Sequence, residues 1–155
     1  MPPPPLPTPH DQARRFARVR EAHRTEMQED YVELIGDLIE ATGEARAADL
    51  AERFGVTAAT VANTLGRLKR AGLIEMQPYR SIFLTPKGAE MAHEARKRHA
   101  LVVEFLLSLG VSSDTAELDA EGLEHHLSEE TLEAMEAFSR HAAGDGSATP
   151  SRARR

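Results

Sequence analysis

Residues 45–71, ARAADLAERFGVTAATVANTLGRLKRA, determine how the first half of the chain folds. Residues 45–54 predict a short helix, and Gly55 after it can adopt the left-handed backbone conformation of a tight turn. Thr57 can then cap a second helix over residues 58–71. A short helix, a glycine turn and a second helix indicate a helix-turn-helix, whose second helix enters the major groove of DNA.

The second of these helices has one apolar and one polar face. Val61, Leu65 and Leu68 recur at helical spacing and should point inward. Hydroxyl, amide and guanidinium groups should point outward, at Thr60, Asn63, Thr64, Arg67 and Arg70. A plain helical hairpin without DNA contact is the alternative interpretation.

The predicted DNA-contacting residues begin at the N-terminal end of this helix, with Thr57 and the small Ala58. We expect Thr60 and Asn63 to face base edges. Arg67 and Arg70 should face phosphates, because long cationic side chains away from the helix N-terminus reach the DNA backbone readily.

Two strand-like runs, residues 73–76 and 81–84, follow Gly72 and predict a β-hairpin. A hairpin after a helix-turn-helix is a wing, and Arg80 near its tip can reach a phosphate or an adjacent minor groove. Residues 44–84 are therefore predicted to form a winged helix. Thr85 and Pro86 then begin a further helix, with proline in the tolerated first turn.

The remaining segments predict a mainly α-helical chain. Residues 11–35 contain neither proline nor glycine and predict one long helix, or two in series with a break in 21–30, ending near residues 42–43. Helices are also expected over 86–109, from about 113 onward, and over 131–138 with Ser128 as N-cap. Residues 1–10 predict a disordered proline-rich leader, and residues 144–155 a flexible tail. The expected domains are 11–86, an N-terminal winged helix-turn-helix domain with a helical extension, and 87–143, an all-helical domain.

Composition and charge limit the possible functions. The net charge is −6, yet residues 57–88 hold five basic residues against one acid, and residues 101–145 hold eleven acids against one base. A basic middle and an acidic C-terminal half indicate two separate roles. The absence of cysteine excludes disulfides and thiolate ligands. Neither a membrane span nor a signal peptide is visible, so we expect a soluble, cytoplasmic protein.

Several acidic residues and histidines have spacings that suit metal binding. Glu121, Glu124 and His125 would share one helix face and could chelate a divalent cation. Asp30 and Glu33, three residues apart, would also share a face. In isolation each group could equally be a solvated surface, and a lone histidine such as His99 is more often packed or exposed than a ligand.

Taken together, residues 27–138 resemble the short, manganese-sensing branch of the diphtheria-toxin-repressor family. The resemblance rests on DYVE at 30–33, a winged helix, Arg98-His99, and DAEGLEHH at 119–126. It implies that the all-helical domain binds metal and forms a homodimer. It also implies a pair of Mn²⁺ ions held by six residues and bridged by Glu121 and Glu124. The implied ligands are Asp30, Glu33, His99, Glu121, Glu124 and His125.

The same resemblance implies metal-dependent binding of the dimer to palindromic operator DNA, repression of manganese uptake genes and control of an efflux gene. The extension over residues 1–28 departs from the shortest family members and has no assigned role. Carboxylates and imidazoles suit Mn²⁺, but they also bind later divalent metals. A sensor of Fe²⁺ is therefore an alternative interpretation. Two further alternatives are a winged-helix regulator that answers a small organic ligand and a dinuclear metallohydrolase.

Overall fold

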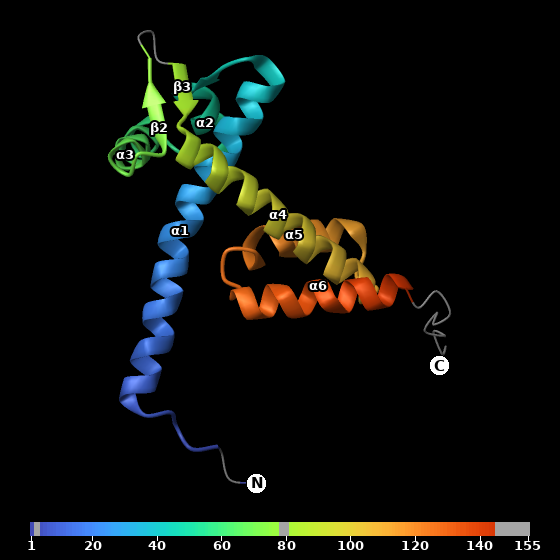
Figure 1. Ribbon diagram of the computed structural model, residues 1–155. Helices are drawn as coiled ribbons and strands as arrows, with labels where there is room; N and C mark the ends of the chain where they lie inside the picture. Colours follow the sequence, from blue (N-terminus) through green and yellow to red (C-terminus); the bar gives the residue numbers. More distant parts are fainter. Residues whose placement is uncertain (2–3, 78–80, 145–155) are drawn as a thin grey trace. The chain divides into compact units, whose positions relative to one another are not determined.

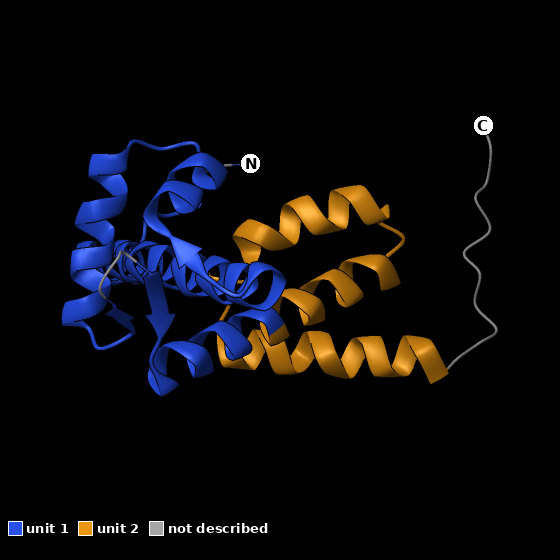
Figure 2. Cartoon of the chain, turned by 90° about the horizontal axis from the view of Figure 1, so that it is seen from above, with its two compact units in different colours: residues 1–96 blue, residues 97–155 orange. Residues whose placement is uncertain are grey.

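The fold is described here from a computed structural model, over residues 1, 4–77 and 81–144. The chain divides into two compact units, unit 1 (residues 1–96) and unit 2 (residues 97–155), which Figure 2 colours separately. The elements labelled in Figure 1 are, in chain order, α1 (Pro9–Thr42), β1 (Ala45–Arg46), α2 (Ala47–Phe54), α3 (Ala58–Arg70), β2 (Ile74–Met76), β3 (Ser81–Leu84), α4 (Pro86–Ser108), α5 (Ser113–Leu123) and α6 (Glu129–Gly144). Within this described part, every helix is too short or too polar to cross a membrane.

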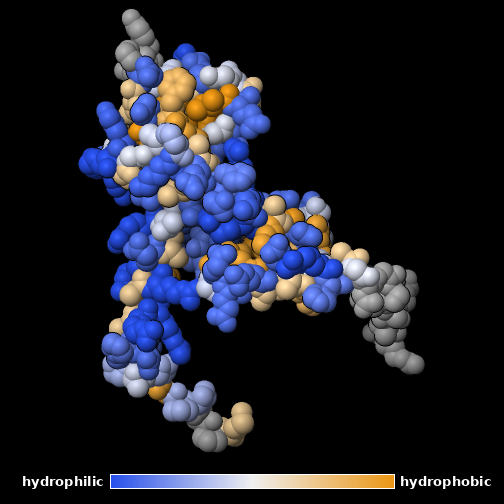
Figure 3. Space-filling view, in the orientation of Figure 1, coloured by the Kyte–Doolittle hydropathy of each residue, from blue (hydrophilic) through white to orange (hydrophobic). Residues whose placement is uncertain are grey.

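Helix α1 is a single continuous helix, so the break considered within residues 21–30 is not formed. It begins at Pro9, inside the segment expected to be disordered, because the Thr8 hydroxyl accepts a hydrogen bond from the Asp11 N–H at 3.1 Å. It ends at Gly43, whose φ of 84° is readily adopted by glycine. Residues 11–21 are exposed throughout, and this part of the helix is mostly hydrophilic in Figure 3.

The predicted helix-turn-helix is confirmed in unit 1. Gly55 has a φ of 65° between α2 and α3, and the Thr57 hydroxyl accepts from the Thr60 N–H at 3.2 Å. Val61, Leu65 and Leu68 are buried, as the sequence predicts.

The expectation that Thr64 points outward is wrong. Its hydroxyl donates to the Thr60 carbonyl at 3.1 Å, and this bond to its own helix allows the side chain to be buried.

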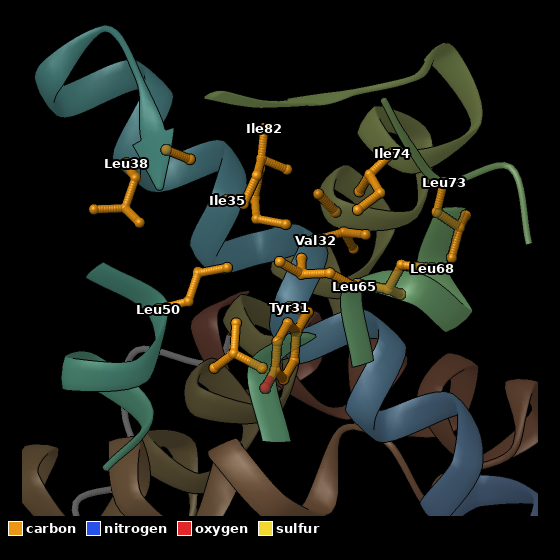
Figure 4. Packing of buried hydrophobic residues seen from close by; sticks show 13 residues of the cluster. Tyr31, Val32, Ile35, Leu38, Leu50, Leu65, Leu68, Leu73, Ile74 and Ile82 are labelled. Carbon is orange, nitrogen blue, oxygen red and sulfur yellow. The ribbon is translucent and has the colours of Figure 1, made fainter. Parts of the chain in front are cut away.

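The wing belongs to a three-stranded antiparallel sheet with the order β1-β3-β2. In the central strand, Ile82 pairs with Ala45 on one side and Met76 on the other. Residues 45–46 form strand β1, and the helix expected over 45–54 therefore begins at Ala47. Figure 4 shows how the buried side chains of the sheet and helices pack into one core, among them Val32, Ile35, Leu50, Leu68 and Ile82. This core fixes the helix-turn-helix against α1.

In unit 2, the last turns of α4 pack with α5 and α6. Val102, Ala120 and Leu132 form its buried centre. Ser128 caps α6, accepting from the Thr131 N–H at 3.3 Å, as predicted. Large apolar side chains nevertheless stay exposed in this unit, at Leu107, Leu109, Leu118, Leu123 and Phe138.

Candidate metal centre and DNA-contacting surface

The six predicted metal ligands are divided between the two units. Asp30 and Glu33 lie on α1 in unit 1. The other four lie in unit 2, and we call them the unit 2 cluster: His99, Glu121, Glu124 and His125. Each group has its own geometry.

The structure brings the unit 2 cluster together around His99, which lies on α4. Its Nδ1 atom is 3.3 Å from Glu124 Oε2 and 3.7 Å from Glu121 Oε2. The other carboxylate oxygen of Glu124 is 3.2 Å from His125 Nε2. His99 therefore contacts both carboxylates and Glu124 contacts both imidazoles, so the four predicted ligands form one connected cluster.

The local fold that presents Glu124 and His125 differs from the expected helix face. Helix α5 ends at Leu123, and Glu124 is its C-cap. The chain then turns tightly, with the His126 N–H donating to the Leu123 carbonyl at 3.0 Å. Thus Glu121 comes from the helix, whereas His125 comes from the turn. The turn places Glu124 and His125 in buried positions, at 2% and 9% exposure, while Glu121 stays exposed.

The charges around His99 alter its acidity. Partial burial by itself lowers the pKa of His99, but a hydrogen bond with Glu117 and the charges of Glu124 and Glu121 outweigh it. The net result is that the pKa of His99 lies above its ordinary value of 6.5. The neighbouring carboxylates thus favour the protonated form of His99.

The donor set of the unit 2 cluster fits a divalent cation. A carboxylate as deeply buried as Glu124 is costly unless positive charge lies beside it. Carboxylate oxygen and imidazole nitrogen are ligands for Mn²⁺ and its neighbours in the first transition row. His99, Glu121, Glu124 and His125 would hold such an ion.

In unit 1, the two carboxylates of α1 are three residues apart and partly exposed. Asp30 lines a cavity of about 390 Å³, together with Tyr31 of its own helix and Thr60 and Thr64 of α3. One carboxylate of the predicted metal site is thus placed beside the helix predicted to read DNA. That Asp30 and Glu33 complete the coordination of the same ions as the unit 2 cluster stays a prediction.

The predicted DNA-contacting residues of unit 1 are all exposed where the structure describes them. They are Thr57, Ala58, Thr60, Asn63, Arg67 and Arg70. The Thr57 and Thr60 hydroxyl oxygens are 3.0 Å apart. The residue that caps α3 is therefore hydrogen-bonded to a residue that is predicted to contact a base. Arg80 lies outside the described residues.

Comparison with known proteins shows the family to which the chain belongs. The family described as "Iron dependent repressor, N-terminal DNA binding domain" matches residues 23–82, and "Iron dependent repressor, metal binding and dimerisation domain" matches residues 85–150. The chain belongs to the iron dependent repressor family. Both parts of this repressor are therefore present, one for DNA and one for metal and dimerisation.

Individual repressors of known sequence support the same conclusion. "Transcriptional regulator MntR" of Escherichia coli O157:H7 is 58% identical over 123 residues, which cover 79% of each chain. "HTH-type transcriptional regulator MntR" of Listeria monocytogenes serotype 4b (strain F2365) is 39% identical over 104 residues, or 67% of this chain and 73% of the relative. These relatives favour a transcriptional regulator over a metallohydrolase.

Solved structures of repressors agree with the fold. "Manganese-dependent transcriptional repressor complex with manganese" has a TM-score of 0.66 at 30% identity, covering 73% of this chain and 52% of the other. "Structure of the manganese regulator SloR" has a TM-score of 0.65 at 28% identity, covering 74% and 54%. This repressor chain thus spans about half the length of those two solved chains.

One residue near the repressor's candidate metal centre is missing from the predicted set. Glu117 Oε2 lies 2.8 Å from His99 Nε2. A sequence signal for it exists, because Glu117 is four residues before Glu121 on the same helix and side chains at that spacing share a face. The motif that carries the family resemblance begins at Asp119 and does not include this position.

Proposed function

We propose that this chain is a manganese-responsive repressor that binds palindromic operator DNA as a homodimer and represses manganese uptake genes. In this proposal each subunit holds two Mn²⁺ ions, ligated by Asp30, Glu33 and the unit 2 cluster. The observation that carries the proposal is the connected cluster of four predicted nitrogen and oxygen ligands in a chain that also contains a helix-turn-helix.

The choice of manganese rests on the ligands and on the relatives. The chain has no cysteine, so softer metals that favour thiolate gain no such ligand here. Relatives at 58% and 39% identity are named MntR, and a solved structure at 30% identity is titled as a manganese-dependent repressor. Fe²⁺ prefers similar ligands, and it is therefore the competitor that an experiment must include.

The homodimer is supported by the exposed apolar side chains of unit 2. Leu109 is 54% exposed and Leu118 is 77% exposed, and apolar surface of this kind commonly marks an interface between proteins. A twofold-symmetric dimer presents two copies of α3, which is why a palindromic operator is expected. The place of action is then the cytoplasm, where the operator DNA lies.

We take residues 11–86 as the DNA-binding domain and residues 87–143 as the metal-binding and dimerisation domain, between a leader (1–10) and a tail (144–155). The ligands are contributed by both domains. When the metal is absent, the carboxylates of Asp30 and Glu33 repel those of Glu121 and Glu124 and disfavour any arrangement that brings them together. A bound divalent cation supplies the positive charge that reverses this preference. The ligand side chains then favour one arrangement of α3 for DNA binding.

The decisive experiment is fluorescence anisotropy with labelled DNA from the region upstream of the manganese transporter gene in the same genome. We expect tight binding with Mn²⁺ and weak binding in chelator. Glu124→Gln should lose the response to Mn²⁺, whereas Glu133→Gln, which removes an exposed charge from α6, should keep it. Equal affinity for DNA in chelator and in Mn²⁺ would refute the proposal. A stronger response to Fe²⁺ than to Mn²⁺ under anaerobic conditions would mean that the protein senses iron and not manganese.

A further inference from the structure

The hydrogen bond between His99 and Glu117 distinguishes the two nitrogens of one metal-binding imidazole. His99 Nε2 is 2.8 Å from Glu117 Oε2. The opposite nitrogen, Nδ1, faces Glu124 at 3.3 Å and Glu121 at 3.7 Å. One nitrogen therefore faces the predicted ligands, and the other faces a carboxylate that belongs to no predicted ligand set.

We propose that Glu117 is a positioning residue for the metal centre: it accepts a hydrogen bond from His99 Nε2–H and thereby holds Nδ1 in the direction of the metal. This inference rests on the proposed function, since it assumes that His99 is a ligand. Glu117 itself does not coordinate the ion.

The chemistry of imidazole requires such a partner. A neutral imidazole carries its proton on one nitrogen and offers its lone pair on the other, and the hydrogen bond of the protonated nitrogen selects which is which. Metal-bound histidines almost always donate their second N–H to an acceptor, and a carboxylate is among the commonest. A distance of 2.8 Å is normal for a charge-assisted bond to carboxylate.

The positions of both residues make this orientation stable. Glu117 and Glu121 lie one helical turn apart on α5, so the helix that supplies a ligand also supplies the acceptor. The His99 side chain keeps 23% of its surface exposed, and packing alone therefore leaves its ring some freedom to rotate. The bond to Glu117 removes that freedom without occupying Nδ1.

Three variants separate this role from a simple effect of charge. Glu117→Ala removes the acceptor, whereas Glu117→Gln keeps an oxygen that can accept from Nε2–H. Glu133→Ala removes an exposed glutamate elsewhere in unit 2 and serves as the matched control. Circular dichroism and thermal melting of the metal-free proteins establish that all three are folded.

The first readout is the affinity for Mn²⁺, measured by isothermal titration calorimetry. Loss of an outer hydrogen bond to a ligand typically weakens metal binding by about 10–100-fold. Because Glu117 is 58% exposed, water can partly replace it, and we expect the lower end, about tenfold, for Glu117→Ala. We expect Glu117→Gln to stay within about threefold of the wild type and Glu133→Ala to be unchanged.

The second readout is long-range ¹H–¹⁵N correlation NMR of protein loaded with Zn²⁺, which is diamagnetic. In the wild type and Glu117→Gln, the His99 Nδ1 resonance should show metal coordination, and Nε2 should carry a slowly exchanging proton. In Glu117→Ala that proton should exchange rapidly with water.

Three results would overturn the inference: coordination through Nε2, unchanged Mn²⁺ affinity in Glu117→Ala, or a Glu117→Gln protein as weak as Glu117→Ala. The last result would indicate that the charge of Glu117 acts directly on the ion. A wild-type protein that binds no Mn²⁺ would instead refute the proposed function. The two failures are therefore distinguishable.

Discussion

Replacing Gly88 by alanine should destabilise unit 1 at the point where α4 leaves the wing. A Cβ atom built on Gly88 would lie 2.0 Å from the carbonyl oxygen of Leu73 and 3.0 Å from its carbonyl carbon. These obstructing atoms belong to the backbone and cannot rotate away. Overpacking of this kind costs about 1–3 kcal/mol, and here we expect the upper end. The higher helix propensity of alanine relative to glycine offsets at most about 1 kcal/mol of this cost. The net loss should be about 2 kcal/mol.

The bonds around Gly88 would be strained by the same displacement. The Leu73 carbonyl accepts from the Thr85 N–H at 3.1 Å, and the Thr85 hydroxyl donates to the Gly72 carbonyl at 2.7 Å. Lys87 Nζ donates to the Ala71 carbonyl at 3.1 Å. These contacts attach the start of α4 to the end of α3 and the wing.

Tyrosine fluorescence provides an assay that is selective for unit 1. The chain has two tyrosines and no tryptophan, and Tyr31 and Tyr79 both precede residue 97. A loss of about 2 kcal/mol should lower the melting temperature of a unit of this size by about 10 °C. Gly66→Ala, in α3 of the same unit, is the matched control, because a Cβ there meets only the Arg70 Nη1 atom, at an ordinary contact distance of 3.5 Å. If Gly88→Ala melts at the wild-type temperature, the steric argument is wrong.

Four further outcomes are expected. Arg70→Ala should weaken binding of the homodimer to all DNA sequences and reduce the slope of log affinity against log salt by about 1.8, because about 0.9 is lost for the phosphate contact of each of the two subunits. Titrations at several salt concentrations measure this slope, and an unchanged slope would mean that Arg70 contacts no phosphate. Asp30→Met should keep the fold but lose the preference for Mn²⁺ over Fe²⁺ and Co²⁺, measured as anaerobic operator affinity with each metal; an unaltered ranking would mean that Asp30 does not set selectivity. The raised pKa of His99 should make Mn²⁺ binding release a proton and weaken as pH falls, which calorimetry in buffers of different ionisation enthalpy detects. The same raised pKa stabilises the metal-free protein below pH 6.5, and this contribution should be lost as pH rises through the pKa of folded His99.

Local signals made the helix-turn-helix predictable. A glycine turn and a threonine cap act within a few residues, so Gly55 and Thr57 mark the helix ends without knowledge of the rest of the fold. Strand β1 was not predictable in this way, since two residues show no periodicity and the strand exists because it pairs with β3. Thr64 was misplaced for a related reason: a hydroxyl that bonds to its own helix can be buried like an apolar group.

The residues of the candidate metal centre could be predicted from the sequence, but the backbone structure that presents them could not. Spacing indicated Glu121, Glu124 and His125, and the family resemblance added His99; the structure places these four residues in contact with one another through His99 and Glu124. The end of α5 at Leu123 left no such signal, because neither glycine nor proline follows it. A helix face and a tight turn can both bring Glu124 and His125 near Glu121. Sequence spacing alone therefore could not distinguish the two, nor could it show which nitrogen of His99 faces the ligands.

The division of ligands between the units limits how the proposed switch can work. The unit 2 cluster already contains four donors, enough to attract a cation without any change in unit 1. A cation that binds equally well in every arrangement of the units does not change the population of any arrangement. In the proposed switch, the response of DNA binding would then come from the additional affinity that Asp30 and Glu33 contribute as ligands. Coupling between sites is typically about 1–3 kcal/mol, or roughly 5–150-fold in affinity. In the proposed switch, the two carboxylates of α1 would therefore determine the size of the response to metal, while the unit 2 cluster would determine the concentration at which metal first binds.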